Sequence, residues 1–196
     1  MRKLLITAFE PFGGENINAS NLVLERLPDV IGDWELTKLT IPVVFGKAAD
    51  TVIAKASDIR PDAIISLGQA AGRDSVTPEY VAINFVDARI PDNDGFQPVR
   101  EKISQDGPDA YFSTLPVFDM ADNIIKKSLP GKVSFSAGTY VCNSLYYSLL
   151  DHFSGTEVGV AFIHVPLTVD QATDGQPSME LTDMVQAVKC AIEAII

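Results

Sequence analysis

The chain has 196 residues, of which 46% are hydrophobic and 21% charged, and its net charge is −11. This composition is typical of a globular protein and excludes a disordered or coiled-coil chain. The acidic charge argues against nucleic acid and anionic membranes as partners, because both need a basic surface. The length predicts one domain over residues 1–196, and no apolar run approaches the ~18 residues that a membrane span needs.

Strands and helices alternate along the first part of the chain. The apolar run 3–8 predicts a buried strand, and Asn18 or Ser20 can cap a helix that extends to about Leu27. The next predicted elements are a strand over 35–43, a helix over 45–59 and a strand over 62–67.

The second part continues this alternation after a less regular stretch. Residues 76–87 predict a hairpin or an irregular strand pair, and residues 92–95 predict a turn. The remaining predicted elements are a strand over 110–113, a helix over 118–128, a strand over 132–136, a helix that buries Leu145, Tyr146, Leu149, Leu150 and Phe153, a strand over 157–165 and a helix from Ser178. Such alternation predicts an α/β fold with a central, largely parallel sheet and helices on both faces.

The two cysteines have different local settings. Cys142 opens a predicted helix, where the macrodipole and free N–H groups lower a thiol pKa and can hold an oxyanion. A small buried core residue is the alternative. Cys190 lies inside the last helix with no activating neighbour, so we expect a core residue. With no export signal at the N-terminus, both thiols are expected to be reduced in the cytoplasm.

Two further residues could take part in catalysis. His164 ends an apolar strand, and ligands bind at the carboxyl ends of parallel strands. Glu79 is the single carboxylate in an uncharged stretch and could orient an imidazole. The alternatives are a core histidine bonded to backbone and a solvated turn glutamate. His152, late in a helix, is expected to be solvated.

The sequence shows no pattern for a metal or nucleotide. CxxC, HxH and HExxH are absent, and the glycines at 13–14 and 68–72 match neither the dinucleotide fingerprint nor the phosphate-binding loop. We therefore expect no metal site and no nucleotide.

Five segments together carry a family resemblance that spans essentially the whole chain. They read AFEPFGG at 8–14, GQAAGR at 68–73, VAIN and DARIPDN within 81–93, SAGTYVCN at 136–143 and FIHVP at 162–166. In this order they resemble the pyroglutamyl peptidase I family of cysteine peptidases, also called pyrrolidone-carboxylate peptidases. Ala71 and Tyr80 depart from the family pattern, which leads us to expect glycine and arginine there.

The resemblance implies a three-layer α/β/α sandwich around a mixed sheet. It also implies a cytoplasmic homotetramer, without metal or cofactor, that removes N-terminal pyroglutamate (5-oxoproline) from peptides. Carried over residue by residue, Cys142 is the nucleophile that forms a thioester, His164 is the general base and acid, and Glu79 orients His164.

A blocked terminus is a neutral lactam, so its site needs apolar walls and a few hydrogen-bonding groups. Gln69 is a candidate partner for the lactam amide, and Arg89 could stabilise the oxyanion together with the N–H of Cys142. The candidate walls are Phe9, Phe12, Tyr140 and Val141, with core packing as the alternative for the two phenylalanines.

Two other functions stay open from the sequence. A different thiol- or nucleoside-handling enzyme could use a similar sheet, because a fold does not fix a function. An inactive relative could serve as a binding module, although the complete set of Glu79, Cys142 and His164 argues against this. Trial substrates would test the first alternative and thiol reactivity the second.

Overall fold

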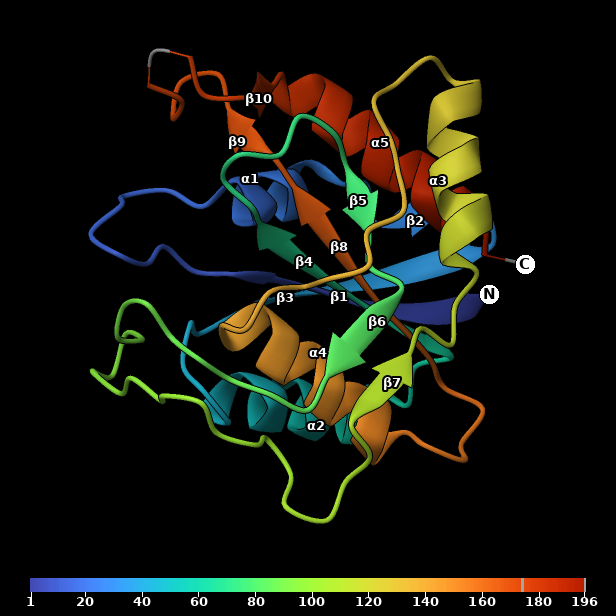
Figure 1. Cartoon of the computed structure of the whole chain (residues 1–196). Coiled ribbons are helices and arrows are strands. Elements are labelled where there is room, and N and C mark those ends of the chain that lie inside the picture. The colour runs from blue at the N-terminus through green and yellow to red at the C-terminus, as the bar shows by residue number, and fades with distance from the viewer. Residues whose placement is uncertain (174, 196) are drawn as a thin grey trace.

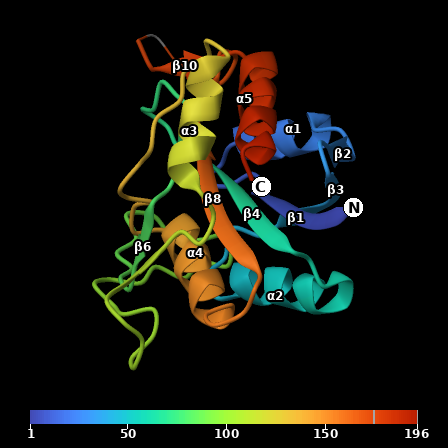
Figure 2. The same cartoon turned by 90° about the vertical axis from the view of Figure 1, so that its right-hand side faces the viewer.

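The computed structural model describes residues 1–173 and 175–195, and within them a six-stranded sheet lies between two layers of helices (Figures 1 and 2). Its strands are, in spatial order, β2 (Val30–Ile31), β3 (Trp34–Ile41), β1 (Arg2–Phe9), β4 (Ala63–Gln69), β8 (Gly159–Val165) and β5 (Thr77–Pro78). The four central strands are parallel, and the short edge strands β2 and β5 are antiparallel to their neighbours. The predicted α/β/α fold with a largely parallel mixed sheet is confirmed.

Strand β1 shows how the sheet divides the core. Leu4, Ile6 and Ala8 pack on one face, whereas Leu5 and Phe9 pack on the other, because successive side chains of a strand alternate. The first face, called here the α5 face, is covered by α1 (Ala19–Arg26), α3 (Val117–Lys126) and α5 (Leu181–Glu193). The second, called the α4 face, is covered by α2 (Lys47–Ile59) and α4 (Val141–His152).

The predicted buried faces of the helices are confirmed, and so is one of the two predicted N-caps of α1. Asn18 caps α1, and its side chain accepts a hydrogen bond from the Ser20 N–H at 3.0 Å. Helix α4 buries its predicted apolar positions, with Phe153 partly buried just beyond its end. Helix α5 begins three residues later than predicted, because Ser178–Met179 form β10, which pairs with β9 (Leu167–Thr168).

Two strand predictions need correction. Residues 76–87 form no hairpin: β5 pairs with β8, and β6 (Val81–Ile83) pairs with β7 (Ala110–Phe112). The predicted strand 132–136 is wrong, since in this segment the backbone forms only an isolated bridge between Ser134 and Glu79. Strand β2 was not predicted.

The long connection 84–109 borders the carboxyl ends of the central strands. Its predicted turn at 92–95 is confirmed, with the Gly95 N–H bonded to the Asp92 carbonyl at 3.0 Å. The Asp92 carboxylate also accepts from the Phe45 N–H, and the Asn93 amide donates to Glu10. The connection is therefore fixed to the loops that follow β3 and β1.

None of the helices in the described ranges is both long enough and apolar enough to cross a bilayer.

Candidate active site

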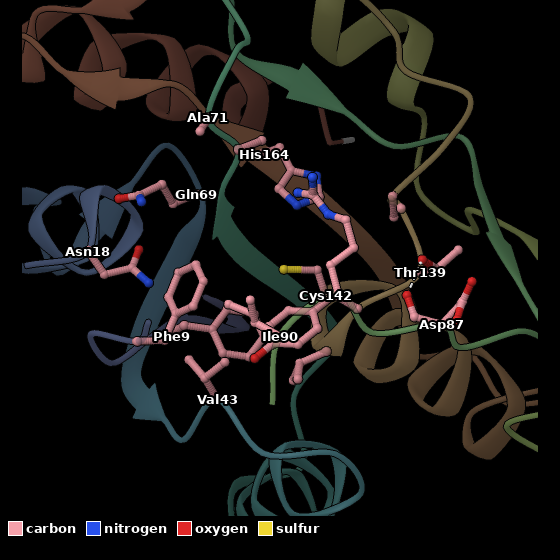
Figure 3. Close-up of a pocket in the computed structure, with 17 residues that line it drawn as sticks. Phe9, Asn18, Val43, Gln69, Ala71, Asp87, Ile90, Thr139, Cys142 and His164 are labelled. Carbon is pink, nitrogen blue, oxygen red and sulfur yellow. Dashed lines mark hydrogen bonds between the residues drawn. The ribbon is translucent and has the colours of Figure 1, made fainter. Parts of the chain in front are cut away.

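A cavity of about 660 Å³ opens where β1, β4 and β8 end (Figure 3). It is bounded by Phe9 from β1, Gln69 from β4, His164 from β8, the connection 84–109 and the first turn of α4. Every predicted site residue except Glu79 lines it. The carboxyl edge of a parallel sheet is where ligands bind in such folds.

Cys142 is the second residue of α4, and its sulfur points into the cavity (Figure 3). The helix has no side-chain cap, and no backbone carbonyl among the described residues accepts a hydrogen bond from the Cys142 N–H. This N–H group therefore remains a free donor at the positive end of the macrodipole. The thiol packs against the backbone of β4, where a Cβ on Gly68 would lie 3.1 Å from its sulfur.

Burial raises the pKa of the Cys142 thiol to about 12, and the charge of Glu79 adds to this rise. The expected lowering of the pKa by the helix terminus is therefore wrong, because the loss of solvation on burial outweighs the effect of the terminus. The resting group is a neutral thiol that needs a base.

Glu79 is fully buried directly after β5, which excludes a solvated turn glutamate. Its Oε1 lies 2.7 Å from Nδ1 of His164. The backbone of Glu79 is fixed as well: its N–H donates to the Phe162 carbonyl at 2.8 Å, and the Tyr146 hydroxyl donates to its carbonyl at 3.0 Å. A carboxylate acceptor at Nδ1 holds the proton there and leaves Nε2 of the neutral imidazole as the acceptor.

Burial lowers the pKa of His164, and the contact with Glu79 opposes that shift only in part. The imidazole is thus neutral at neutral pH and able to take a proton. Figure 3 shows His164 and Cys142 facing the same cavity.

Arg73 completes this charged group and was missed as a functional residue by the sequence analysis. Its Nη1 lies 2.6 Å from Oε1 of Glu79 and also donates to the Thr77 hydroxyl, while Nη2 donates to the Ser136 carbonyl at 3.0 Å. The guanidinium supplies the positive charge that a buried carboxylate needs. The segment GQAAGR contains Arg73, but nothing local in the sequence indicates that Glu79 is its partner.

Aromatic side chains form one wall of the cavity. Phe9 is 2% exposed and packs against Phe162, with ring centroids 6.5 Å apart, so it belongs both to the core and to the cavity. Phe12 packs against Tyr140 at 6.1 Å, and the Tyr140 hydroxyl donates to the Pro91 carbonyl at 3.0 Å.

Polar groups occupy the remaining wall. The amide oxygen of Gln69 accepts from the Ala19 N–H at 2.7 Å and from Nε2 of Gln171 at 2.8 Å, so only its NH₂ group is left for a ligand. Arg89 is exposed and reaches the cavity from the connection 84–109. Sequence reasoning missed Asp87 and Thr139 as lining residues. Their backbones pair at 3.0 Å and join that connection to the segment before α4.

The sequence model of the pyroglutamyl peptidase family matches residues 2–196. The chain belongs to this family. The predicted assignment to the pyroglutamyl peptidases, as a cysteine hydrolase, is confirmed.

Relatives and solved structures agree with the family assignment over the full length. The pyrrolidone-carboxylate peptidase of Levilactobacillus brevis is 47% identical, with 99% of this chain and 97% of the relative covered. That of Thermoanaerobacter sp. (strain X514) is 45% identical, with 98% and 97% covered. The crystal structure of pyroglutamyl peptidase I from Bacillus amyloliquefaciens is similar with a TM-score of 0.93 at 41% identity, covering 97% of this chain and 95% of that one.

The two departures from the family pattern lie in different places. Ala71 lines the cavity (Figure 3). Tyr80 lies outside it, in an aromatic cluster with Phe112, Phe118 and Phe135, whose ring centroids are 5.0, 5.2 and 5.8 Å from that of Tyr80. Of the two, only Ala71 can therefore touch a bound substrate directly.

Proposed function

We propose that this pyroglutamyl peptidase removes N-terminal pyroglutamate through a triad of Cys142, His164 and Glu79 and a thioester acyl-enzyme. The observation that carries the proposal is the buried Glu79–His164 contact of 2.7 Å beside a thiol in the same cavity. An oriented base next to a nucleophile is the arrangement that covalent acyl transfer requires.

The protonation states define the first step. Because the thiol pKa is about 12 and the imidazole is neutral, Nε2 of His164 takes the thiol proton as the sulfur attacks the pyroglutamyl carbonyl carbon. Glu79 then stabilises the imidazolium through its contact with Nδ1. The Cys142 N–H at the start of α4, together with Arg89, stabilises the oxyanion.

His164 next protonates the leaving amine as the carbon–nitrogen bond breaks, and the pyroglutamyl group remains on Cys142 as a thioester. In the second half His164 takes a proton from water, which attacks the thioester carbonyl. As the carbon–sulfur bond breaks, His164 returns this proton to the sulfur, which regenerates the thiol, and free pyroglutamate leaves.

The aromatic wall and the polar wall of the cavity recognise different parts of the lactam. Phe9, Phe12, Tyr140 and Val141 enclose a flat, uncharged ring, and the NH₂ group of Gln69 meets its carbonyl. An N-terminal glutamate would lose the solvation of its two charges against the aromatic wall. An N-terminal proline carries a charged amine and lacks the carbonyl.

Turnover of pyroglutamyl-, prolyl- and glutamyl-amides tests this proposal. We expect the pyroglutamyl-amide to be preferred by ~10²-fold or more in kcat/KM, since leaving buried charges or polar groups unpaired costs several kcal/mol. Phe12→Ala should raise KM for the pyroglutamyl-amide more than it lowers kcat. The matched control is Phe118→Ala, an exposed aromatic residue outside the cavity, which should leave both constants unchanged. Comparable kcat/KM values for the three substrates would contradict the proposed function.

The homotetramer, the cytoplasmic location, the single domain and the independence from metal and cofactor stay predictions. Sedimentation analysis of the purified chain would measure the assembly, and cell fractionation the location. Limited proteolysis would test the single domain, and turnover after dialysis against a chelator should be unchanged.

A further inference from the structure

The amide group of Gln69 is held in one orientation by two other residues. Its Oε1 accepts the Ala19 N–H at 2.7 Å and Nε2 of Gln171 at 2.8 Å. Gln171 lies in the turn after β9, which is remote in sequence from both of the other residues. An amide oxygen has two lone pairs, so these two donors fill it.

Backbone groups fix both amides without ambiguity. The Thr168 N–H, which can only donate, lies 3.1 Å from one end of the Gln171 amide, so that end is the oxygen. The Thr168 hydroxyl bonds to the same oxygen at 3.1 Å. The opposite end of Gln171 is therefore its NH₂ group, and the atom it meets on Gln69 must be an acceptor. The Ala19 N–H, which is also a donor, lies 2.7 Å from the same atom of Gln69, so this atom is the amide oxygen.

The consequence is a group on the cavity wall that can only donate. The Nε2 of Gln69 has no hydrogen-bond partner among residues 1–173 and 175–195, and Gln69 lines the cavity (Figure 3). A pyroglutamyl ring offers one carbonyl acceptor and one N–H donor. Only the carbonyl can pair with this NH₂ group, and the carbonyl is the group that distinguishes the ring from proline.

We propose that Gln171 is a positioning residue for substrate selection: by filling the oxygen of Gln69, it keeps the Gln69 NH₂ group directed to the lactam carbonyl. This rests on the proposed function. It adds a residue outside the cavity lining and predicts which of the two polar groups of the lactam is recognised there.

The substitution Gln171→Glu separates this role from a structural one. One carboxylate oxygen keeps both hydrogen bonds to Thr168, so the turn stays supported. The other replaces the NH₂ group and places an acceptor against the oxygen of Gln69. Gln69 then either rotates, which sets its NH₂ group against the new carboxylate and loses the Ala19 bond, or keeps a repulsive contact. Rotation removes the donor from the cavity wall, whereas the repulsive contact pushes the Gln69 amide out of its position there.

We expect Gln171→Glu to raise KM for a pyroglutamyl-amide by about tenfold or more, with a smaller change in kcat, because one polar group of the bound ring loses its partner. The inhibition constant of 2-pyrrolidone, the lactam ring alone, should rise in parallel, and the melting temperature should stay near that of the unaltered chain. Gln171→Met removes the donor without adding an acceptor, so the Ala19 N–H still orients Gln69 and KM should rise less.

Three results would overturn the inference. The first is a Gln171→Glu variant with unchanged KM and unchanged 2-pyrrolidone inhibition. The second is a larger loss in Gln171→Met than in Gln171→Glu that follows the melting temperature, which would make Gln171 a support of the turn. The third is an unaltered chain that does not turn over pyroglutamyl-amides, which would overturn the proposed function as well and is measured first.

Discussion

The two cysteines occupy opposite faces of one sheet, and both are within helices. Cys190 lies near the C-terminal end of α5, fully buried in the apolar core of the α5 face, with Nε2 of Gln186 at 3.5 Å from its sulfur. Cys142 lies on the α4 face, and burial raises its pKa to about 12. A low thiol pKa therefore does not distinguish the nucleophile proposed here. The difference is that Cys142 has a cavity for a substrate and a neutral imidazole facing that cavity.

Replacing each cysteine by serine should give the largest difference in turnover between the two faces of the sheet. Cys142→Ser should lower kcat/KM for a pyroglutamyl-amide by ~10⁴-fold or more, as is typical when a nucleophile that acts with its base is removed. Cys190→Ser should keep the kinetics of the unaltered chain and lower the melting temperature by several degrees, because a hydroxyl in an apolar core costs ~1–3 kcal/mol. Retained turnover in Cys142→Ser would remove it as the nucleophile.

Removing the charge that supports the imidazole should give the next largest effect. Glu79→Gln should lower kcat by ~10²–10⁴-fold, because the imidazolium formed in the reaction loses its stabilising carboxylate. Glu79 raises the pKa of His164 against the lowering by burial. Without that charge the pKa falls further, so the acidic limb of kcat/KM should move to lower pH.

The control for Glu79→Gln is Asp58→Asn on the exposed side of α2, where the carboxylate forms a surface ion pair with Lys55 at 3.2 Å. Such pairs contribute little, so rate and pH profile should be unchanged. A pH profile of Glu79→Gln that coincides with that of the unaltered chain would argue against the orienting role.

Replacing one glycine by alanine on each face of the sheet should give a smaller effect on turnover. A Cβ on Gly68 would lie 2.8 Å from the ring of Phe162 and 3.1 Å from the Cys142 sulfur, so Gly68→Ala should displace the thiol and lower kcat by about tenfold or more. A Cβ on Gly131 would lie 2.7 Å from Ile124, in the core of the α5 face. Gly131→Ala should therefore cost ~1–3 kcal/mol of stability without a change in kcat. Equal kinetic losses in the two variants would mean that overpacking on either side of the sheet disturbs the site.

The sequence predicts the central strands and the triad candidates for identifiable reasons. Strands β1, β4 and β8 are buried on both faces, so they appear as continuous apolar runs. Cys142 and His164 lie at the ends of predicted elements, where polar groups have access to a cavity. These features depend on a few neighbouring residues and can therefore be read locally.

The missed features depend on partners far along the chain. Arg73 and Gln171 have no local signal, since their roles come from contacts with Glu79 and Gln69. The alternation of residues 76–87 is real, but the two strands in it pair with β8 and β7 rather than with each other. The raised pKa of Cys142 is also a tertiary effect, because burial of the thiol outweighs a favourable position at a helix terminus.

The position of β8 in the sheet determines when the proposed triad can first form. It is the last strand of the large sheet to be synthesised, yet it lies between β4 and β5, with Gly159 paired to Ala63 and Ile163 to Pro78. A growing chain that ends before β8 has the thiol of Cys142 but neither the imidazole nor the strand to which Glu79 is bonded. In the proposed mechanism, a chain that ends before β8 therefore has a nucleophile without its base and cannot turn over a substrate.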